Sequence, residues 1–105
     1  MVGLNEEQLT AKKMPYEVGV ARYAEIAKSQ MLGDETGMLK LLFDPKTLKL
    51  HGVHVMGVRA TEIVHLGQAV LSYGGTIEYF RDAVFNYPTL TEAYKIAALN
   101  GLNKL

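Results

Sequence analysis

The chain has 105 residues, which suits one domain with a single modest hydrophobic core and leaves no room for a second. Its hydrophobic fraction of 49% and charged fraction of 21% exclude a disordered or fibrous chain. Eleven basic and eleven acidic residues cancel without blocks of like charge, so we expect no nucleic-acid partner and no binding to an anionic membrane.

The chain contains no cysteine, which excludes a disulfide framework, a thiolate metal site and a cysteine nucleophile within it. This composition fits a cytoplasmic protein. The apolar runs are far shorter than the roughly 20 residues that a membrane span needs, and the acidic start NEEQ is unlike a signal peptide. Because MVGLNEEQ resembles a starting methionine placed before an excised segment, we expect a fragment of a larger protein.

The first predicted element is a short helix. Asn5 followed three residues later by Gln8 is typical of a helix start, and Pro15 ends the helix because it favours an extended residue before it. A strand is predicted from residue 16, with Gly19 as a possible bulge. The side chains expected on one side of this strand are Tyr16, Val18 and Val20. A short helix of about one turn is predicted within residues 24–31.

Two further strands predict an antiparallel hairpin. Residues 38–43 alternate in character, and residues 49–57 do so again after a turn that contains Pro45. The predicted faces are Leu39, Leu41 and Phe43 opposite Lys40 in the first strand, and Val53 and Val55 opposite His54 and Met56 in the second.

From Ala60 the apolar period changes to that of an amphipathic helix, which we expect to end at Gly74. Thr76 is a candidate cap for a short helix over residues 77–84. Thr89 is the candidate cap of the last helix, with Glu92 completing a capping box. The order of elements predicts an α+β fold in which an antiparallel sheet is packed with helices.

Most candidate sites have simple structural explanations. In a strand, His51 and His54 would point to opposite faces, so we expect no metal site. His65 lies on the polar stripe of its predicted helix and is expected at the surface or in a subunit contact. Glycines clustered as in nucleotide-binding loops are absent. The small residues of the last helix fit core packing or a subunit interface; they are Ala93, Ala97, Ala98 and Gly101.

The remaining candidates surround the start of the last helix. Tyr87 and Pro88 precede Thr89, and Glu92 follows within the expected first turn. On spacing alone, the favoured interpretation is a tyrosine packed at a helix entrance followed by a capping box, with no chemistry.

The strings PYEV, GMLKLLFD and HGVHVMGVRATEIVHLGQAV resemble the C-terminal dimerisation domain of the flavin-dependent pyridine nucleotide-disulfide oxidoreductases. This is the family of glutathione reductase and lipoamide dehydrogenase, and the resemblance covers essentially the whole chain. Within it, TIEYF, FNYPTLTEAY and AALNGLNKL are most similar to the soluble, Si-specific NAD(P)⁺ transhydrogenases. The resemblance implies one dimerisation domain over residues 1–105, a homodimer, and preceding FAD and nicotinamide domains that this chain lacks.

The family enters its last helix with His-Pro-Thr and a following glutamate, and this segment of one subunit completes the active site of the other. Here Tyr87 stands at the position of the acid–base histidine, and Glu92 matches the glutamate that orients it. By resemblance, Tyr87 and Pro88 lie near the FAD of the partner subunit. A tyrosine side chain, with an ordinary pKa of about 10, is a poor proton shuttle at neutral pH. We therefore expect no catalytic residue in this chain.

The function implied by the resemblance is hydride transfer from NADPH through FAD to NAD⁺, which needs no redox dithiol. The fragment alone is expected to be inactive. One alternative is a related flavoprotein disulfide or mercuric reductase; the mercuric enzymes share the tyrosine but carry a vicinal cysteine pair and lack the proline. Another alternative is a free-standing dimerisation module without catalysis.

Overall fold

The computed structural model describes residues 1–33, 36–86 and 89–105. In these residues the elements follow one another as β1 (Val2–Gly3), α1 (Glu6–Ala11), β2 (Glu17–Arg22), the 3₁₀ helix η1 (Tyr23–Glu25), α2 (Ala27–Leu32), β3 (Met38–Phe43), β4 (Leu50–Met56), α3 (Ala60–Ser72), α4 (Glu78–Asp82) and α5 (Glu92–Leu102). The strands form an antiparallel sheet in the order β1-β4-β3-β2. The α+β fold predicted from the sequence is confirmed.

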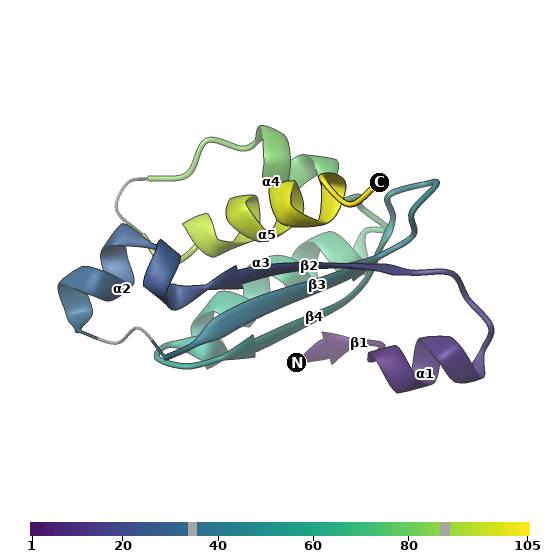
Figure 1. The fold of residues 1–105 in the computed structure, drawn as a ribbon, viewed down its shortest axis with the longest axis horizontal. Coiled ribbons are helices and arrows are strands. Elements are labelled where there is room, and N and C mark those ends of the chain that lie inside the picture. Colours follow the sequence, from purple (N-terminus) through teal and green to yellow (C-terminus); the bar gives the residue numbers. More distant parts are fainter. Residues whose placement is uncertain (34–35, 87–88) are drawn as a thin grey trace.

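Helices α3 and α5 cover one face of the sheet. Helix α5 packs on β2 and β3, α3 packs on β4 and β1, and α4 packs on α5. Figure 1 shows α4 and α5 on one side of the sheet and α1 on the other. The buried residues between the sheet and the helices include Leu39, Leu41, Phe43, Val53, Ile63, Phe80, Tyr94 and Ala97. This core places the beginnings of α3 and α5 on the same side of the sheet.

Helix α1 begins as predicted. The Asn5 side chain accepts a hydrogen bond from the Gln8 amide at 2.7 Å, and the Gln8 side chain accepts one from the Asn5 amide at 2.9 Å. These reciprocal bonds satisfy two of the amides that a helix start leaves unpaired. The Lys40 ammonium of β3 donates to the Glu6 carboxylate at 2.5 Å, which joins α1 to the second face of the sheet.

The β3–β4 hairpin also forms as predicted, with Leu41 opposite Val53. Asp44 begins its turn, and hydrogen bonds from the Thr47 and Lys46 amides hold the pKa of this exposed carboxyl below its usual range. The register of the β3–β4 pairing shifts between Leu42 and Phe43, which marks a β-bulge or similar irregularity at this point.

The prediction of a bulge at Gly19 is wrong. Residues of β2 pair with β3 in continuous register, and Gly19 lies opposite Leu41. The buried side of β2 carries Gly19 and Ala21, whereas Val18 and Val20 are only half-buried. A Cβ atom on Gly19 would lie 2.1 Å from the Ala97 carbonyl oxygen. The glycine is therefore needed because helix α5 crosses directly over the strand.

Helix α4 begins without the cap predicted for it. Its N-cap residue is Ile77, which makes no side-chain capping bond, and the Thr76 hydroxyl instead lies 3.4 Å from the Glu78 carboxylate. The Thr76 backbone forms a β-bridge with Lys49, and its carbonyl oxygen accepts a hydrogen bond from the Tyr79 amide at 3.3 Å. The backbone bonds thus define this helix start.

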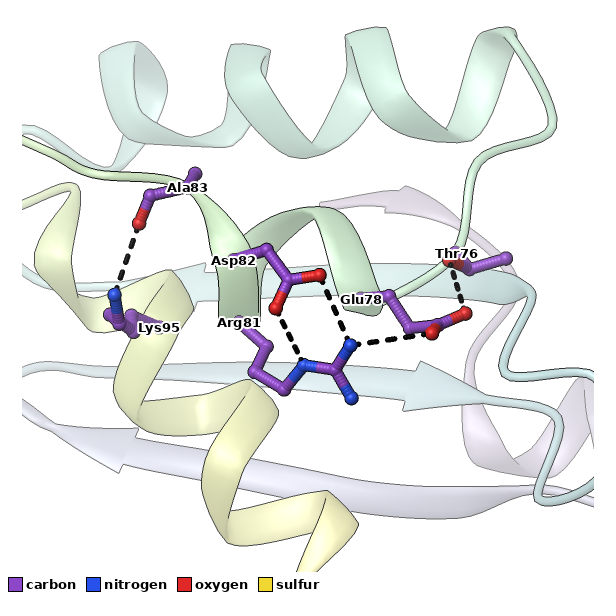
Figure 2. A network of polar contacts seen from close by, with 6 residues as sticks. All are labelled: Thr76, Glu78, Arg81, Asp82, Ala83 and Lys95. Atoms are coloured by element: carbon purple, nitrogen blue, oxygen red, sulfur yellow. Dashed lines mark hydrogen bonds and ion pairs between the residues drawn. The ribbon is translucent and has the colours of Figure 1, made fainter.

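Figure 2 shows the exposed face of α4, where the Arg81 guanidinium lies between two carboxylates. Its Nε donates to Asp82 at 2.8 Å, and its Nη2 donates to Glu78 at 3.3 Å. The bond to Asp82 raises the pKa of Arg81, and the same bond lowers the pKa of Asp82. Because these groups are solvent-exposed, this network adds little to stability.

Candidate functional site

The two residues that the sequence singles out, Tyr87 and Pro88, lie outside the described residues. The structure describes the chain on both sides of them. The Lys95 ammonium of α5 donates to the Ala83 carbonyl at 3.1 Å (Figure 2). The segment that leaves α4 is therefore fixed to the helix that follows residues 87 and 88.

The start of α5 differs from the predicted capping box. Glu92 is the first helical residue and Thr91 is the N-cap, with no side-chain capping bond. The Thr89 hydroxyl lies 2.7 Å from the Thr91 hydroxyl. Backbone bonds from Glu92 to Thr89 (3.4 Å) and from Ala93 to Leu90 (3.0 Å) span three residues, so the chain enters α5 through a 3₁₀ turn. The prediction that Thr89 caps this helix, with Glu92 at its third position, is wrong.

A pocket of about 600 Å³ opens beside this turn. Its described lining comes from α2, the start of α3 and the entrance of α5, and consists of Lys28, Arg59, Glu62, Ile63, Thr89, Leu90 and Thr91. Ile63 and Leu90 are each only 5% exposed and supply an apolar floor. Around them stand two cationic side chains, one carboxylate and two hydroxyls. The pocket can therefore hold a partly apolar group with polar substituents.

Arg59 has an unusual backbone at the rim of this pocket. It is the N-cap residue of α3 and adopts the left-handed conformation, with φ of 59° and ψ of 22°. Few residues other than glycine adopt this conformation. Gly57, two residues before Arg59, also has a positive φ, of 124°, and its carbonyl oxygen accepts a hydrogen bond from the Ala60 amide at 3.2 Å. These two residues turn the chain sharply from β4 into α3 and bring Arg59 to the pocket.

Glu62 supplies the one carboxylate among the described lining residues. They include no histidine and no cysteine, and their hydroxyls belong to Thr89 and Thr91, which bond to each other. A nucleophile needs an adjacent base to become reactive. Within the described lining, neither hydroxyl has a histidine as its base.

Tyr94 connects the two helices that border the pocket. Its buried hydroxyl donates to the Ile63 carbonyl of α3 at 2.5 Å and accepts from the Gly67 amide at 3.0 Å. Burial raises the pKa of Tyr94 to about 12, so the hydroxyl keeps its proton at neutral pH. The side chain thus joins α5 to α3 directly.

The histidines and carboxylates of the described residues form no metal site of their own. Within residues 1–33, 36–86 and 89–105, no three His, Asp or Glu side chains form a group that could hold a metal ion. Exposed His65 lies 3.0 Å from the Gln68 side chain, as expected of a surface residue. His54 Nε2 lies 3.3 Å from the Leu4 carbonyl oxygen. The Nε2 atom of His51 is buried, without a hydrogen-bond partner in the described part of the chain.

A second pocket, of about 390 Å³, lies on the strand face that carries Lys40. It is lined by Met1, Met38, Lys40, His54, Val55 and Met56. Met38 and Met56 are direct partners across β3 and β4, and Met56 is 64% exposed. This surface is mainly apolar, and its two polar side chains, Lys40 and His54, lie within hydrogen-bond distance of Glu6 and of the Leu4 carbonyl oxygen.

Sequence reasoning missed Lys28 and Arg59 as lining residues of the larger pocket, and Tyr94 as the link between α3 and α5. No spacing rule connects α2 with α3 or predicts a left-handed arginine. For Tyr94, a sequence signal exists: it falls among the small residues Ala93, Ala97 and Ala98, all of which are buried. That pattern places Tyr94 on the core side of α5, although it does not identify the partner of the hydroxyl.

The described residues contain no helix long and apolar enough to cross a membrane.

The whole chain has close relatives among known proteins. It is 60% identical over 104 residues to a protein named soluble pyridine nucleotide transhydrogenase from Mycobacterium tuberculosis, and the match covers 99% of this chain and 22% of the relative. A protein of the same name from Hahella chejuensis is 53% identical over 107 residues, with 99% of this chain and 23% of the relative covered. The chain therefore spans less than a quarter of the length of these relatives.

Solved structures share the fold. The HOCl-induced flavoprotein disulfide reductase RclA from Escherichia coli matches with a TM-score of 0.88 and 26% identity, over 93% of this chain and 22% of that protein. LpdA from Mycobacterium tuberculosis matches with a TM-score of 0.86 and 18% identity, over 93% of this chain and 21% of that protein. The family profile described as pyridine nucleotide-disulphide oxidoreductase, dimerisation domain, matches residues 1–98. The chain belongs to this family of dimerisation domains.

Proposed function

We propose that this chain is the dimerisation domain of a cytoplasmic FAD-dependent transhydrogenase that moves hydride from NADPH to NAD⁺. The observation that carries the proposal is the 60% identity, over 99% of the chain, to a protein named soluble pyridine nucleotide transhydrogenase. FAD, held by other domains of the full-length protein, would accept the hydride from NADPH and pass it to NAD⁺.

The identity of residue 87 supports this reaction over disulfide reduction. Reduction of a disulfide needs a group that exchanges protons near neutral pH, and histidine meets that need whereas tyrosine does not. Hydride transfer between two nicotinamides through a flavin creates no thiolate to protonate. Tyr87 fits a reaction of this kind.

The role proposed for Tyr87 and Pro88 is to contact the FAD of the partner subunit in a homodimer. The described residues support a positioning role, since the chain is anchored before this pair by Ala83 and after it by Tyr94. Glu92, at the start of α5, would stabilise the positive end of that helix. None of the three residues is assigned a catalytic step.

The isolated chain, residues 1–105, acts in this proposal as one dimerisation domain without activity. The described lining of its larger pocket contains no histidine and no cysteine, and its sequence lacks the glycine-rich loop that binds a dinucleotide. Activity then requires the flavin and nicotinamide domains of the full-length protein.

The experiment that tests this proposal uses the full-length protein loaded with FAD. NADPH and the thionicotinamide analogue of NAD⁺ are mixed with the enzyme, with no disulfide and no mercuric ion present. Rapid reduction of the analogue is the expected result. NADPH oxidation that starts only when a disulfide or mercuric ion is added would instead assign the protein to the reductases. A full-length protein that forms a dimer but does not oxidise NADPH under either condition would be a non-catalytic module.

A further inference from the structure

Two methionines and a histidine gather on the strand face that carries Lys40. Met38 and Met56 are direct partners across β3 and β4, and residues paired in this way carry their side chains on the same face of a sheet. His54 lies two residues before Met56 in the same strand, so its side chain projects from that face as well. These three residues line the second pocket together with Met1, Lys40 and Val55. The pocket therefore holds two strand thioethers beside one imidazole.

The ring of His54 is held in one tautomer. Its Nε2 atom lies 3.3 Å from the Leu4 carbonyl oxygen. Because a carbonyl oxygen only accepts hydrogen bonds, Nε2 carries the ring proton in this contact, and Nδ1 keeps its lone pair in the neutral ring. Histidines that bind a metal ion through one nitrogen commonly donate from the other nitrogen to a backbone carbonyl. The contact with Leu4 thus leaves Nδ1 of His54 as the ligand atom.

The donor atoms of this pocket suit a soft metal ion. Thioether sulfur and imidazole nitrogen are uncharged, and thioethers favour Cu(I). Soft-ligand zinc sites and iron–sulfur clusters use cysteine thiolates, and the chain has no cysteine. No carboxylate stands among the described lining residues of this pocket, which disfavours Mg²⁺, Ca²⁺ and Mn²⁺. The donor set therefore selects Cu(I).

The charge of Lys40, the cationic side chain in the described lining of this pocket, is balanced. Its Nζ atom lies 2.5 Å from a carboxylate oxygen of Glu6. This ion pair leaves little net charge beside the thioethers, so a monovalent cation meets little repulsion there.

The two sulfur atoms can adjust to a bound ion. Met56 is 64% exposed, and Met38 is half-buried. Methionine is unbranched, with three rotatable bonds and a polarisable sulfur, so each thioether can turn toward an ion at little cost. The exposure of Met56 also gives the ion a path from solvent.

We propose that Met38, Met56 and His54 form a Cu(I) site, in which the two sulfurs and Nδ1 of His54 bind the ion and the Leu4 carbonyl orients the imidazole. His54 is joined here by thioethers and not by His51, the partner that the sequence spacing argues against. The site shares no described lining residue with the larger pocket. It consequently does not rest on the proposed function.

The test titrates the full-length, FAD-loaded enzyme with Cu(I) under anaerobic conditions, after its accessible thiols are blocked with N-ethylmaleimide. Cu(I) is supplied as its coloured complex with bicinchoninate, and the loss of colour measures transfer of the ion to the protein. We expect Met38→Leu, Met56→Leu and His54→Gln each to weaken binding at least about tenfold, because even the outer partners of metal ligands contribute about 10- to 100-fold to affinity. Met31→Leu is the matched control, since Met31 is 68% exposed and lies in α2.

X-ray absorption at the copper edge supplies a second measurement. Cu(I) bound to the wild-type enzyme should have two sulfur ligands and one nitrogen ligand, and Met56→Leu should remove one of the sulfurs. Unchanged affinity and an unchanged sulfur count in both methionine variants would overturn the proposal. An equal loss of affinity in Met31→Leu would overturn it too, because Cu(I) would then bind to exposed thioethers in general. Should His54→Gln fail to fold, the two leucine variants, which keep the size of the side chain, decide.

Discussion

At Asn5, two reciprocal hydrogen bonds with Gln8 hold the start of α1. Replacing Asn5 by alanine should lower the free energy of unfolding by about 1 kcal/mol, because one helix amide loses its cap. Urea unfolding of the chain measures the change. Asn103→Ala, an exposed position just after α5, is the control and should have almost no effect. Equal losses from both substitutions would contradict the role assigned to the capping box.

The burial of Tyr94 gives stability a dependence on alkaline pH. Its pKa is about 12 in the folded chain, above the roughly 10 of an unfolded tyrosine, so the folded state binds the proton more tightly. The resulting stabilisation is fully present below about pH 10 and is lost as the pH rises through about 12. We expect Tyr94→Phe to flatten the fall in unfolding free energy over this window, and Tyr73→Phe to leave it intact. An unchanged slope in Tyr94→Phe would contradict this prediction.

Single residues also mark where sequence reasoning succeeds. The Asn5–Gln8 capping box was predictable because both partners lie within one helical turn. The left-handed backbone of Arg59 and the bond from Tyr94 to Ile63 were not, since they depend on segments that meet only in the folded chain. The role of Tyr87 and Pro88 stays a prediction, because it depends on a partner subunit.

At the scale of elements, α5 approaches the sheet closely because Gly19 and Gly101 face each other. A Cβ atom on Gly101 would lie 2.5 Å from the Phe43 ring and 3.2 Å from the Gly19 Cα. We expect Gly19→Ala to lower the unfolding free energy by about 1–3 kcal/mol, as overpacking does. Hydrogen exchange should show the loss of protection along α5 and β2.

The control for this substitution is Gly74→Ala. Gly74 has a φ of +67° and nothing near its missing Cβ atom, so alanine there strains the backbone without touching α5. In Gly74→Ala, the loss of hydrogen-exchange protection should stay near the end of α3. If Gly19→Ala leaves the exchange of α5 amides unchanged, the helix does not rest on the strand as described.

Elements with strong periodicity were predictable, and their ends were less so. The hairpin of β3 and β4 and the length of α3 follow from the alternation of apolar residues and from Gly74. The starts of α4 and α5 were mispredicted because backbone bonds of 3₁₀ turns satisfy the amides that Thr76 and Thr89 were expected to cap. The buried side of β2 was also missed, since small residues there make room for α5.

For the whole molecule, the proposed function uses the identity of residue 87 to distinguish a transhydrogenase from a disulfide reductase. We predict that Tyr87→His in the full-length enzyme does not create disulfide reductase activity, because a proton shuttle alone supplies no redox dithiol. The measurement is NADPH oxidation with an oxidised glutathione substrate, and Tyr87→Phe is the matched control. A measurable gain of disulfide reduction in Tyr87→His would contradict the positioning role proposed for this residue.

The central claim is that hydride passes from NADPH to the flavin and on to NAD⁺ without a thiol intermediate. The most direct test measures both half-reactions of the full-length enzyme by anaerobic rapid mixing, before and after alkylation of its accessible thiols. This chain has no cysteine and would not itself react with the alkylating agent. The account predicts that NADPH reduces the flavin and NAD⁺ reoxidises it at the same rates in both preparations. A reduced flavin that NAD⁺ cannot reoxidise, or reoxidation that alkylation abolishes, would contradict it.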